Sequence, residues 1–400
     1  MEITVGGVVF YVAIDPFGMV WIYIGTNKCV PYRIDKKEIM QKTYSSLRVL
    51  VNTPIYGGSY TTAQYVYNGL KSLGVTVQMT DNSIAESLLK RLLQNQIIDR
   101  NTNYLTAILS DLIWQDISIF KPHIVFMVAQ SPFSDQLMKS IKDSGIVSIY
   151  WFVEDFRRFG YWRDIAHYFD YFYMIQRGHQ KLDILPLAAD PLTHKRIELA
   201  NHEKTFYGSD ISFMGAAYPN RINFFKHFDK TDLKLWGTGW YESELSNFNI
   251  PLKSQRITPQ QSNMIYQSSK ININLHSSNS LENDKIGDFV NPRTFEIAAC
   301  GGFQMVDDRP AVREFFESDK EIVYFTSVED ALEKSKYYLA NENLRHKIAI
   351  ASQERTLKFH TYALRLSSIF DKIFQPKQNS SSMSKQEALE MLLNTFITSK

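Results

Sequence analysis

Residues 291–302 read NPRTFEIAACGG, an order that predicts a short helix placed to receive a phosphorylated ligand. Asn291 is a favoured N-cap, Pro292 suits the first helical position, and the closing glycine pair supplies a left-handed stop. We expect about nine helical residues, with the amino end pointing into a cleft. Free N–H groups and the helix dipole at that end favour a phosphate, and Arg293 could add a charge-assisted contact to a diphosphate.

Two acidic residues near this helix have the chemistry to bind sugar hydroxyls. Glu296 lies one turn into the helix, where its two oxygens could accept both hydroxyls of a ribose. Asp288, in the preceding loop, could accept hydroxyls of a sugar attached to the diphosphate. The alternative is that both are ordinary solvated acids near a helix start. The long polar loop at 277–290 and the small residues AACGG favour the functional interpretation.

Strands alternating with helices must position these groups. The apolar strand LRVLVNTP leads into Gly57-Gly58, a helix and a second strand, which is a βαβ unit. The alternation predicts an α/β fold with two Rossmann-like, doubly wound domains, one over 46–190 and one over 191–360. We expect the domains to face a central cleft, where each could hold one substrate of a group transfer.

The two ends of the chain have different patterns. Residues 1–45 alternate apolar and polar side chains around the turn DPFG at 15–18, and they predict a small N-terminal β-hairpin unit. A closing helix is expected over 361–375. A polar linker and a tail helix are expected over 376–400.

Composition excludes several classes of protein. The 400 residues are 44% hydrophobic and 22% charged, which suits a globular chain of two domains. A net charge of +2 does not indicate nucleic-acid binding. Cys29 and Cys300 offer neither a disulfide framework nor a zinc spacing, so we expect a reducing compartment. Without a recognisable signal peptide or transmembrane segment, the expected location is cytoplasmic; peripheral membrane contact and the oligomeric state stay open.

The segment FVNPRTFEIAACGGFQMVDDRP resembles the C-terminal signature of GT-B glycosyltransferases, in which an acidic residue, seven intervening residues and a Glu precede ACG. More closely, the chain resembles the CgeB-like (spore maturation) glycosyltransferases over about 46–372. The stretches that carry this likeness are YWFVEDFRRF, LPLAADP, ISFMGAAYPNR, LWGTGW, SKININLHSSN and KFHTYALR.

The resemblance implies a nucleotide-sugar donor, such as a UDP-, GDP- or TDP-sugar, held mainly by the second domain. It implies an acceptor held by the first domain, no cofactor, no metal ion and retention of the anomeric configuration. By this likeness Glu296 binds the donor ribose and Asp288 the donor sugar, although many relatives have Glu where Asp288 stands. The expected donor-binding set is Gly215, Arg221, His276, Asp288, Asn291, Arg293, Thr294 and Glu296, with both arginines near the diphosphate.

The expected catalytic set is Glu154, Asp155 and Asp288. Glu154 and Asp155 end the strand VSIYWFV and could orient the acceptor or act as a base. The alternative for this pair is capping or ion pairing with Arg157 and Arg158.

Gly57 and Gly58 are expected on the acceptor side, where they could let a substrate approach the backbone; a simple tight turn is the alternative. Trp236 and Trp240 flank GTG and are expected to pack in the core rather than to stack on a base or sugar. His360 is expected to be a packing or hinge residue.

We therefore expect transfer of a sugar to an unknown glycan or protein acceptor. A non-catalytic nucleotide-sugar sensor or scaffold with the same fold is the alternative. An NAD-type oxidoreductase is disfavoured because neither strand–helix turn carries G-x-G-x-x-G, and GTGWYE has Glu242 at the third glycine position.

Overall fold

The computed structural model describes the backbone of nine segments and the side chains from residue 44 onward, apart from those of 99–102. The segments are 2–5, 8–14, 20–25, 30–34, 44–94, 99–177, 182–229, 233–277 and 288–374. The predictions for the turn at 15–18, Cys29, most of the loop at 277–290 and the tail at 376–400 lie outside the described residues.

The chain divides into two compact units. One joins residues 1–47, 70–76 and 366–400, and the other joins 48–69 and 77–365. The first unit contains an antiparallel sheet of order β1-β2-β3-β4. Its strands are β1 (Glu2–Val5), β2 (Val8–Ile14), β3 (Val20–Gly25) and β4 (Val30–Ile34).

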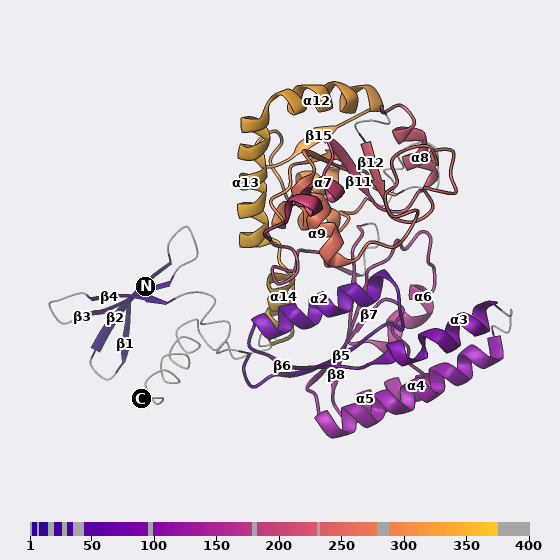
Figure 1. The fold of residues 1–400 in the computed structure, drawn as a ribbon. Helices are drawn as coiled ribbons and strands as arrows, with labels where there is room; N and C mark the ends of the chain where they lie inside the picture. Colours follow the sequence, from indigo (N-terminus) through magenta and orange to yellow (C-terminus); the bar gives the residue numbers. More distant parts are fainter. Residues whose placement is uncertain are drawn as a thin grey trace. The chain divides into compact units, whose positions relative to one another are not determined.

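The first parallel sheet has the order β10-β9-β8-β7-β5-β6. Figure 1 shows α2 along one face of this sheet and α4 and α5 along the other, so the central strand β7 is buried at every residue. The strands are β5 (Arg48–Asn52), β6 (Thr76–Met79), β7 (Ile124–Val128), β8 (Val147–Phe152), β9 (Tyr171–Met174) and β10 (Asp183–Ile184). The helices are α2 (Gly58–Ser72), η1 (Asn82–Ala85), α3 (Glu86–Gln94), α4 (Asp99–Phe120), α5 (Asp135–Asp143), α6 (Trp162–Ile165) and η2 (Ala166–Tyr168).

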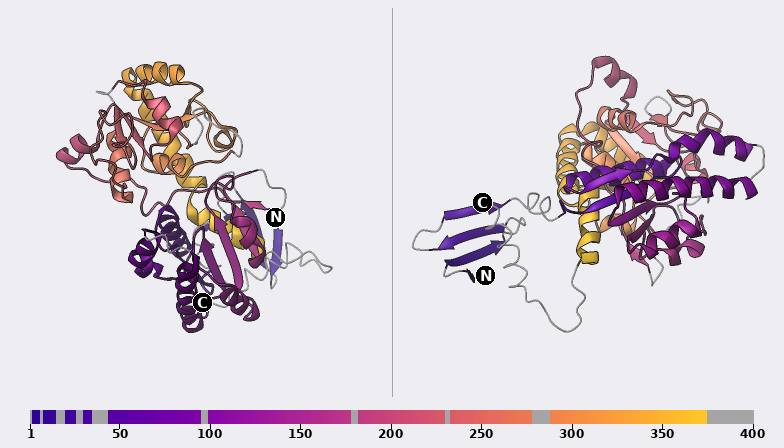
Figure 2. Two further views of the ribbon diagram at one scale, coloured as in Figure 1. Left: turned by 90° about the vertical axis from the view of Figure 1, so that its right-hand side faces the viewer. Right: turned by 90° about the horizontal axis from the view of Figure 1, so that it is seen from below.

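The second parallel sheet has the order β12-β11-β13-β14-β15. Its strands are β11 (Ile211–Met214), β12 (Leu233–Trp236), β13 (Ile271–Asn274), β14 (Gln304–Asp307) and β15 (Val323–Phe325). Its helices are α7 (Asn201–Tyr207), α8 (Pro219–Phe225), α9 (Pro259–Ser268), α10 (Arg293–Ala299), α11 (Pro310–Arg313), α12 (Val328–Ala340) and α13 (Glu342–Phe359), and α14 (Tyr362–Phe374) follows. Figure 2 shows α12 and α13, in orange to yellow, beside this sheet from two further directions.

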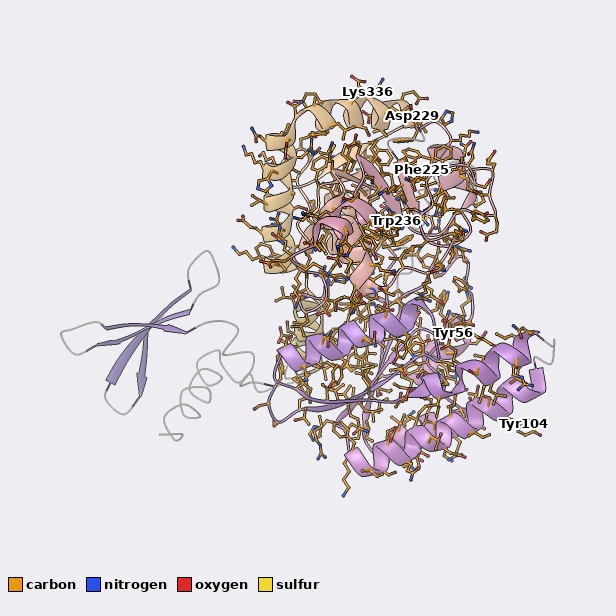
Figure 3. All side chains as sticks on the ribbon, in the orientation of Figure 1. Tyr56, Tyr104, Phe225, Asp229, Trp236 and Lys336 are labelled. Atoms are coloured by element: carbon orange, nitrogen blue, oxygen red, sulfur yellow. The ribbon has the colours of Figure 1, made fainter. Side chains whose placement is uncertain are left out.

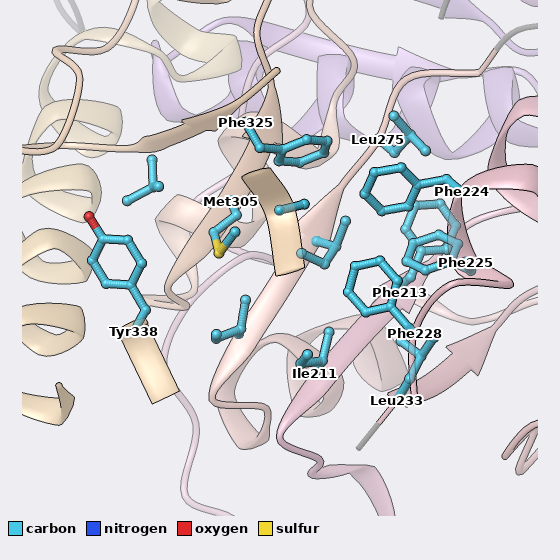
Figure 4. Close-up of a cluster of buried hydrophobic side chains, with 14 of the residues drawn as sticks. Ile211, Phe213, Phe224, Phe225, Phe228, Leu233, Leu275, Met305, Phe325 and Tyr338 are labelled. Carbon is cyan, nitrogen blue, oxygen red and sulfur yellow. The ribbon is translucent and has the colours of Figure 1, made fainter. Parts of the chain in front are cut away.

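Aromatic side chains fill the core on one face of the second sheet (Figure 4). Phe213 on β11 contacts Phe225 on α8 with ring centroids 4.7 Å apart, and Met305 and Tyr338 continue the same cluster. Burial of rings this large gives the second sheet a hydrophobic core of its own.

Both parallel sheets share one strand order, 2-1-3-4-5 in order of appearance, with β10 added to the first sheet. The direction of chain progression reverses between β5 and β7 in the first sheet and between β11 and β13 in the second. Ligands of open α/β sheets bind beyond the carboxyl ends of the strands at such reversal points. The prediction of two Rossmann-like α/β domains is thus confirmed, and the loops after β11 and β13 are the first place to look for a ligand site.

Several elements differ in extent from the expectation. Residues 190–205, which the sequence predicts to be a linker between the two domains, end in helix α7; none of the residues of α7 is buried, so no apolar periodicity could reveal it. The apolar stretch LDILPLAAD at 182–190 predicts a strand that runs into a loop, but only the two exposed residues of β10 are a strand. Helix α10 starts at Arg293 rather than Pro292, because Pro292 serves as its N-cap. Within the described ranges, no helix is long and apolar enough to cross a membrane.

Candidate donor and acceptor sites

The entry into α10 is built from buried amide side chains at the reversal point of the second sheet. Asn291 Oδ1 accepts a hydrogen bond from the N–H of Thr294 at 3.2 Å, and Asn291 Nδ2 donates to Asn274 Oδ1 at 2.9 Å. Asn274 Nδ2 in turn donates to Thr294 Oγ1 at 2.9 Å. Asn291 and Thr294, both expected to contact the donor, therefore hold the start of the helix against β13.

Three N–H groups in the first turn of α10, those of Thr294, Phe295 and Glu296, are already hydrogen-bonded. The N–H groups of Phe295 and Glu296 both donate to the carbonyl of Pro292 at 3.0 Å, and that of Thr294 donates to Asn291. The expectation of free N–H groups at this end is thus contradicted for Thr294 and Phe295, because Asn291 and Pro292 already supply carbonyl acceptors to them. Since α10 has only seven residues as well, attraction for an anion here depends on side-chain charge.

Two buried arginines bind the carboxyl ends of β11 and β13. Arg293 donates to the carbonyls of Met214 and Leu275, the latter at 3.2 Å. Arg221 donates twice to Leu275, at 3.2 and 2.9 Å, and once to Ala216 at 3.0 Å. The sequence placed both arginines near the diphosphate; the structure brings them together at the reversal point, where they satisfy strand-end carbonyls.

The charges of these arginines have no carboxylate partner at ion-pair distance in the part of the chain that is described. Burial lowers the pKa of both groups, and the charge of Arg293 lowers that of Arg221 further. A Cβ on Gly215 would lie 2.2 Å from Arg293 Nη1, so only glycine fits this expected donor-site position. Two uncompensated buried cations create positive potential that a bound anion would stabilise.

His276 at the end of β13 is fully buried and has a structural role. Its Nε2 accepts from the N–H of Asn291 at 3.0 Å, so Nδ1 carries the proton and donates to Asp307 Oδ1 at 2.7 Å. Arg309 Nε donates to Asp307 Oδ2 at 2.6 Å, and Arg309 Nη1 donates to Asp288 at 3.2 Å. This chain of bonds, which we call the entry network, ties the start of α10 to β14.

Asp288 belongs to the entry network through both oxygens. Besides the contact with Arg309, Asp288 Oδ2 accepts from the N–H of Ala311 at 2.7 Å, at the start of α11. Its side chain is 17% exposed. The structure thus gives Asp288 partners within the chain, and its role at the donor sugar or in catalysis stays a prediction.

Glu296 keeps most of its hydrogen-bonding capacity. Oε2 accepts from the hydroxyl of Tyr266 at 3.3 Å, and Oε1 lies 3.8 Å from His194 Nε2, too far for a hydrogen bond. Desolvation raises the pKa of Glu296 to about 7, against smaller lowering effects from Arg293 and Tyr266. A carboxylate with one long hydrogen bond can accept the hydroxyls of a ligand.

Sequence reasoning missed the residues around Glu296. Tyr65 on α2 contacts the ring of His194 edge-on, with centroids 4.9 Å apart, and Tyr362 lies 5.5 Å from Tyr65. Tyr266 comes from α9. No spacing signal relates these positions because the segments come together only through tertiary packing; the stretch LPLAADP ended three residues short of His194.

Glu154 lies after β8, in the loops of the first sheet. Its Oε2 accepts from the hydroxyl of Tyr161 at 2.7 Å, and its Oε1 accepts from Nε2 of Gln130. Burial raises the pKa of Glu154, against lowering hydrogen bonds from Tyr161 and Gln130. Gln130 follows β7 with φ of 70°, a left-handed conformation that costs a non-glycine residue energy and is common at functional sites. Glu154 therefore stays a candidate for orienting an acceptor.

Asp155 forms the contacts that the alternative interpretation predicts, and its catalytic role stays a prediction. Its Oδ1 and Oδ2 accept from Arg157 Nε at 2.9 Å and Nη2 at 2.6 Å, and Gln176 Nε2 donates to Oδ1 at 3.1 Å. Arg158 lies over the ring of Tyr218 instead. The ion pair expected as the alternative interpretation is present for Asp155 and Arg157.

The loop after β5 is a tight turn, and the acceptor-side role of Gly57 and Gly58 stays a prediction. Gly57 has φ of 97°, which a turn residue other than glycine rarely adopts, and Gly58 is the first residue of α2. Tyr56 is 38% exposed beside them (Figure 3). The turn is tight and carries an accessible aromatic ring, which is a common surface for binding sugars.

The remaining candidates pack in the interior. Trp236 and Trp240 are buried, and Trp240 Nε1 donates to the carbonyl of Gly215 at 2.7 Å, so the core-packing interpretation is confirmed. His360 packs against Phe295, with ring centroids 5.4 Å apart, and against two further phenylalanines. Cys300 is buried as well. Among the residues described, no three His, Cys, Asp or Glu side chains gather as metal ligands, and metal independence stays a prediction.

A separate hollow of about 570 Å³ lies beside α7 and β12. Lys234 contributes to its lining, but its Nζ already donates to the carbonyls of Thr205 and Phe206. The candidate residues above take no part in the lining, so we assign this hollow no role in the site. The lining consists of Asn201, His202, Thr205, Phe206, Lys234, Asn249 and Pro251.

Comparison with known proteins agrees with this fold. Residues 221–371 match the family described as glycosyl transferase-like. Spore protein CgeB of Bacillus subtilis is 28% identical over 203 residues, which are 48% of this chain and 61% of CgeB. The chain thus spans about three fifths of the length of that curated relative.

Two solved structures share the fold. A glycosyltransferase from Rickettsia africae has a TM-score of 0.55 and 15% identity, over 84% of this chain and 100% of that one. Alr3699/HepE of Anabaena, in complex with UDP and glucose, has a TM-score of 0.51 and 10% identity, over 82% of this chain and 99% of its own. Identities this low show the fold alone. In the sequence of its second domain the chain is thus similar to the glycosyl transferase-like family and to CgeB, and in its fold it is similar to the glycosyltransferase from Rickettsia africae.

Proposed function

We propose that this protein transfers a sugar from a nucleotide-sugar donor to a protein or cell-surface glycan acceptor. The proposed donor is a UDP-, GDP- or TDP-sugar, and the proposed reaction takes place in the cytoplasm, retains the anomeric configuration and uses no metal ion. The observation that carries the proposal is the position of Glu296, one turn along the same helix as Arg293, at the reversal point of the second sheet.

The arginine pair supports binding of the donor diphosphate. Arg221 and Arg293 hold two positive charges at the ends of β11 and β13 without an ion-pair partner in the described part of the chain. The packing at Gly215 keeps the loop after β11 against them. Negative charge that develops on a leaving nucleoside diphosphate would be stabilised by this fixed positive potential without a metal ion.

Glu296 supports binding of the donor ribose. Its carboxylate has acceptor capacity left after the bond from Tyr266, and a ribose presents two adjacent hydroxyls. The structure of HepE that holds UDP and glucose has the same fold, which makes a donor of this chemical class the natural first choice for this chain.

In the proposed reaction, the bond between the anomeric carbon and the diphosphate oxygen breaks, and the acceptor oxygen bonds to that carbon on the same face. The acceptor proton passes to the departing diphosphate, so the chain need not supply a base. Glu154, hydrogen-bonded to Gln130 and Tyr161, orients the acceptor hydroxyl.

The first experiment measures thermal stabilisation by UDP-, GDP-, ADP-, TDP- and CMP-sugars, followed by assays of donor hydrolysis and transfer. One class of donor should stabilise the protein, by about 2.7 kcal/mol at a hundredfold excess over the dissociation constant. Glu296→Ala should weaken binding by about tenfold or more and abolish turnover, because it removes the acceptor for the ribose. Glu354 is an exposed carboxylate on α13, so Glu354→Ala is the matched control and should change neither donor affinity nor turnover.

A non-catalytic sensor or scaffold is the second candidate, and the bonds that occupy both oxygens of Asp288 favour it. Donor binding that depends on Glu296, without hydrolysis or transfer to any glycan tested, would support the sensor. Absence of stabilisation by every nucleotide sugar would contradict both functions.

A further inference from the structure

We propose that His194 is a positioning residue for Glu296, and that its Nε2–H donates the hydrogen bond that holds this carboxylate in place when a nucleotide binds. The inference rests on the proposed function, which assigns the donor ribose to Glu296. It adds a residue from the segment before α7 that would set the preference of the site for a ribose.

The hydrogen bonds of His194 determine which nitrogen carries the proton. The backbone N–H of Asp190 donates to His194 Nδ1 at 3.1 Å, so Nδ1 is an acceptor and the neutral ring carries its hydrogen on Nε2. Burial lowers the pKa of His194 to about 3, which keeps the ring neutral at physiological pH. The contact with Glu296 is therefore a potential hydrogen bond rather than an ion pair.

The Nε2–H group of His194 makes no hydrogen bond with any described residue. Nε2 is buried, and no hydrogen-bond acceptor within the described segments reaches it. Glu296 Oε1 lies 3.8 Å away, less than 1 Å beyond a normal hydrogen bond. A buried donor left unpaired costs about 1–3 kcal/mol, so closing this gap is favourable. Contacts at active sites are often long in the free protein and shorten when the ligand binds.

The segment around His194 is held firmly enough to position another group. Asp190 Oδ2 accepts from Asn68 Nδ2 and from the hydroxyl of Thr193, both at 2.7 Å. The ring of Tyr65 packs edge-on against the imidazole. The imidazole therefore has a fixed orientation, and a shift of the Glu296 side chain is the simpler way to close the gap.

The number of hydrogen bonds that the Glu296 carboxylate can accept matches the hydroxyls of a ribose. An ionised carboxylate accepts about four hydrogen bonds. The hydroxyl of Tyr266 supplies one to Oε2 of Glu296, and Nε2–H of His194 would supply one to Oε1. One acceptor position then remains on each oxygen, which matches the two hydroxyls of a ribose. Without His194, only Tyr266 would orient the carboxylate.

Two substitutions of His194 test the roles of its two ring nitrogens separately. In His194→Asn, the amide oxygen can replace Nδ1 as the acceptor for Asp190, but no donor reaches Glu296. In His194→Gln, the longer amide can replace Nε2 as the donor to Glu296, while the bond from Asp190 is lost. The two variants therefore remove one function each from the same position.

The experiment measures the dissociation constants of UDP and 2′-deoxy-UDP by calorimetry, and of the guanine pair if the donor screen selects GDP. The wild type should prefer the ribonucleotide. His194→Asn should reduce that preference by about tenfold, which corresponds to one charge-assisted hydrogen bond, whereas His194→Gln should preserve it. Thermal melts verify that each variant is folded.

His360→Asn is the matched control. His360 is also buried, its pKa is also lowered to about 3 chiefly by burial, and its Nε2 also has no partner among the described groups, but it faces phenylalanine rings. It should leave the ribose preference unchanged.

An unchanged preference in folded His194→Asn would overturn the inference. So would an equal loss of affinity for both nucleotides in both variants, which would indicate a purely structural ring. In either case a ribose preference that is lost in Glu296→Ala would leave the proposed function intact. No binding of any nucleotide by the wild type would overturn the proposed function and the inference together.

Discussion

At the residue scale, the site depends on Glu296, a carboxylate only 12% exposed that has no charged partner at ion-pair distance among the described residues. Desolvation raises the pKa of Glu296 to about 7, so close to half of the carboxyl groups are ionised at neutral pH. A ribose would provide hydrogen bonds that stabilise the ionised form. Ligand binding and loss of the proton are therefore linked.

We predict that the affinity for the nucleotide-sugar donor rises by about tenfold between pH 6 and pH 8, because Glu296 must be ionised to accept both hydroxyls. The groups around it do not titrate in this window: burial raises the pKa values of Tyr65, Tyr266, Tyr362 and Cys300, and lowers that of His194 to about 3. Arg293 stays charged, although burial lowers its pKa. Calorimetric titrations at three pH values test this, and Glu296→Gln should show no such slope.

The free protein should show the opposite trend. Because the folded-state pKa of Glu296 is raised from 4.5 to about 7, the native state holds a proton that the unfolded chain releases. This contribution to the free energy of unfolding is fully present below pH 4.5 and falls by on the order of 3 kcal/mol in all as pH rises from 4.5 through about 7. A wild type and a Glu296→Gln variant whose stabilities vary identically with pH would contradict this assignment.

At the element scale, the short helix α10 depends on its surroundings more than on its own sequence. The entry network and the amide bonds of Asn291 hold its first turn, and Gly301, with φ of 73°, ends it. Helices this short are not stable alone, so tertiary hydrogen bonds must set their position.

We predict that Asp307→Ala lowers the free energy of unfolding by about 3–5 kcal/mol, because it leaves the buried guanidinium of Arg309 without its main partner and also removes the bond to His276. Glu317→Gln is the control, because the side chains of its ion pair, Glu317 and Lys320, are 60% and 71% exposed and solvent screens their attraction, so the loss of stability should be small. Urea unfolding at constant m-value measures both. Similar small losses of unfolding free energy in Asp307→Ala and Glu317→Gln would show that the entry network does not stabilise the fold.

At the scale of the whole molecule, two sheets of the same strand order carry different side chains at their reversal points. The second sheet has the arginine pair and Glu296, and the first has Gly57, Gln130 and Glu154. This division suits one substrate per sheet.

We predict that the donor alone slows amide hydrogen exchange in residues 211–217 and 291–299 and leaves 48–57 unchanged, because a ligand protects the segments that it contacts. Mass spectrometry of exchange with and without the selected nucleotide sugar measures this. The Glu296→Ala variant should lose the protection. Protection confined to 48–57 would place the donor on the first sheet and contradict the assignment.

Much of the fold could be read from the sequence, because burial on both faces leaves solid apolar strands and covering helices leave a regular period. The segment around β7 and the glycines after β5 and β11 were found in this way. Helix α7 was not, since it buries none of its residues. His194 was not either, since an isolated histidine shows no pattern and its partner Glu296 lies about a hundred residues away.

The sequence by itself determined the alternation of strands and helices and the positions of Arg293 and Glu296 on a short helix after β13, because periodicity and helix stop signals are local. Only the tertiary structure decided how the polar groups there are used. His276 is hydrogen-bonded to Asn291 and Asp307, and Asn291 and Asp288 also find partners within the chain, since parallel pairing brings β13 beside β14 and each buried polar group must find a partner within reach.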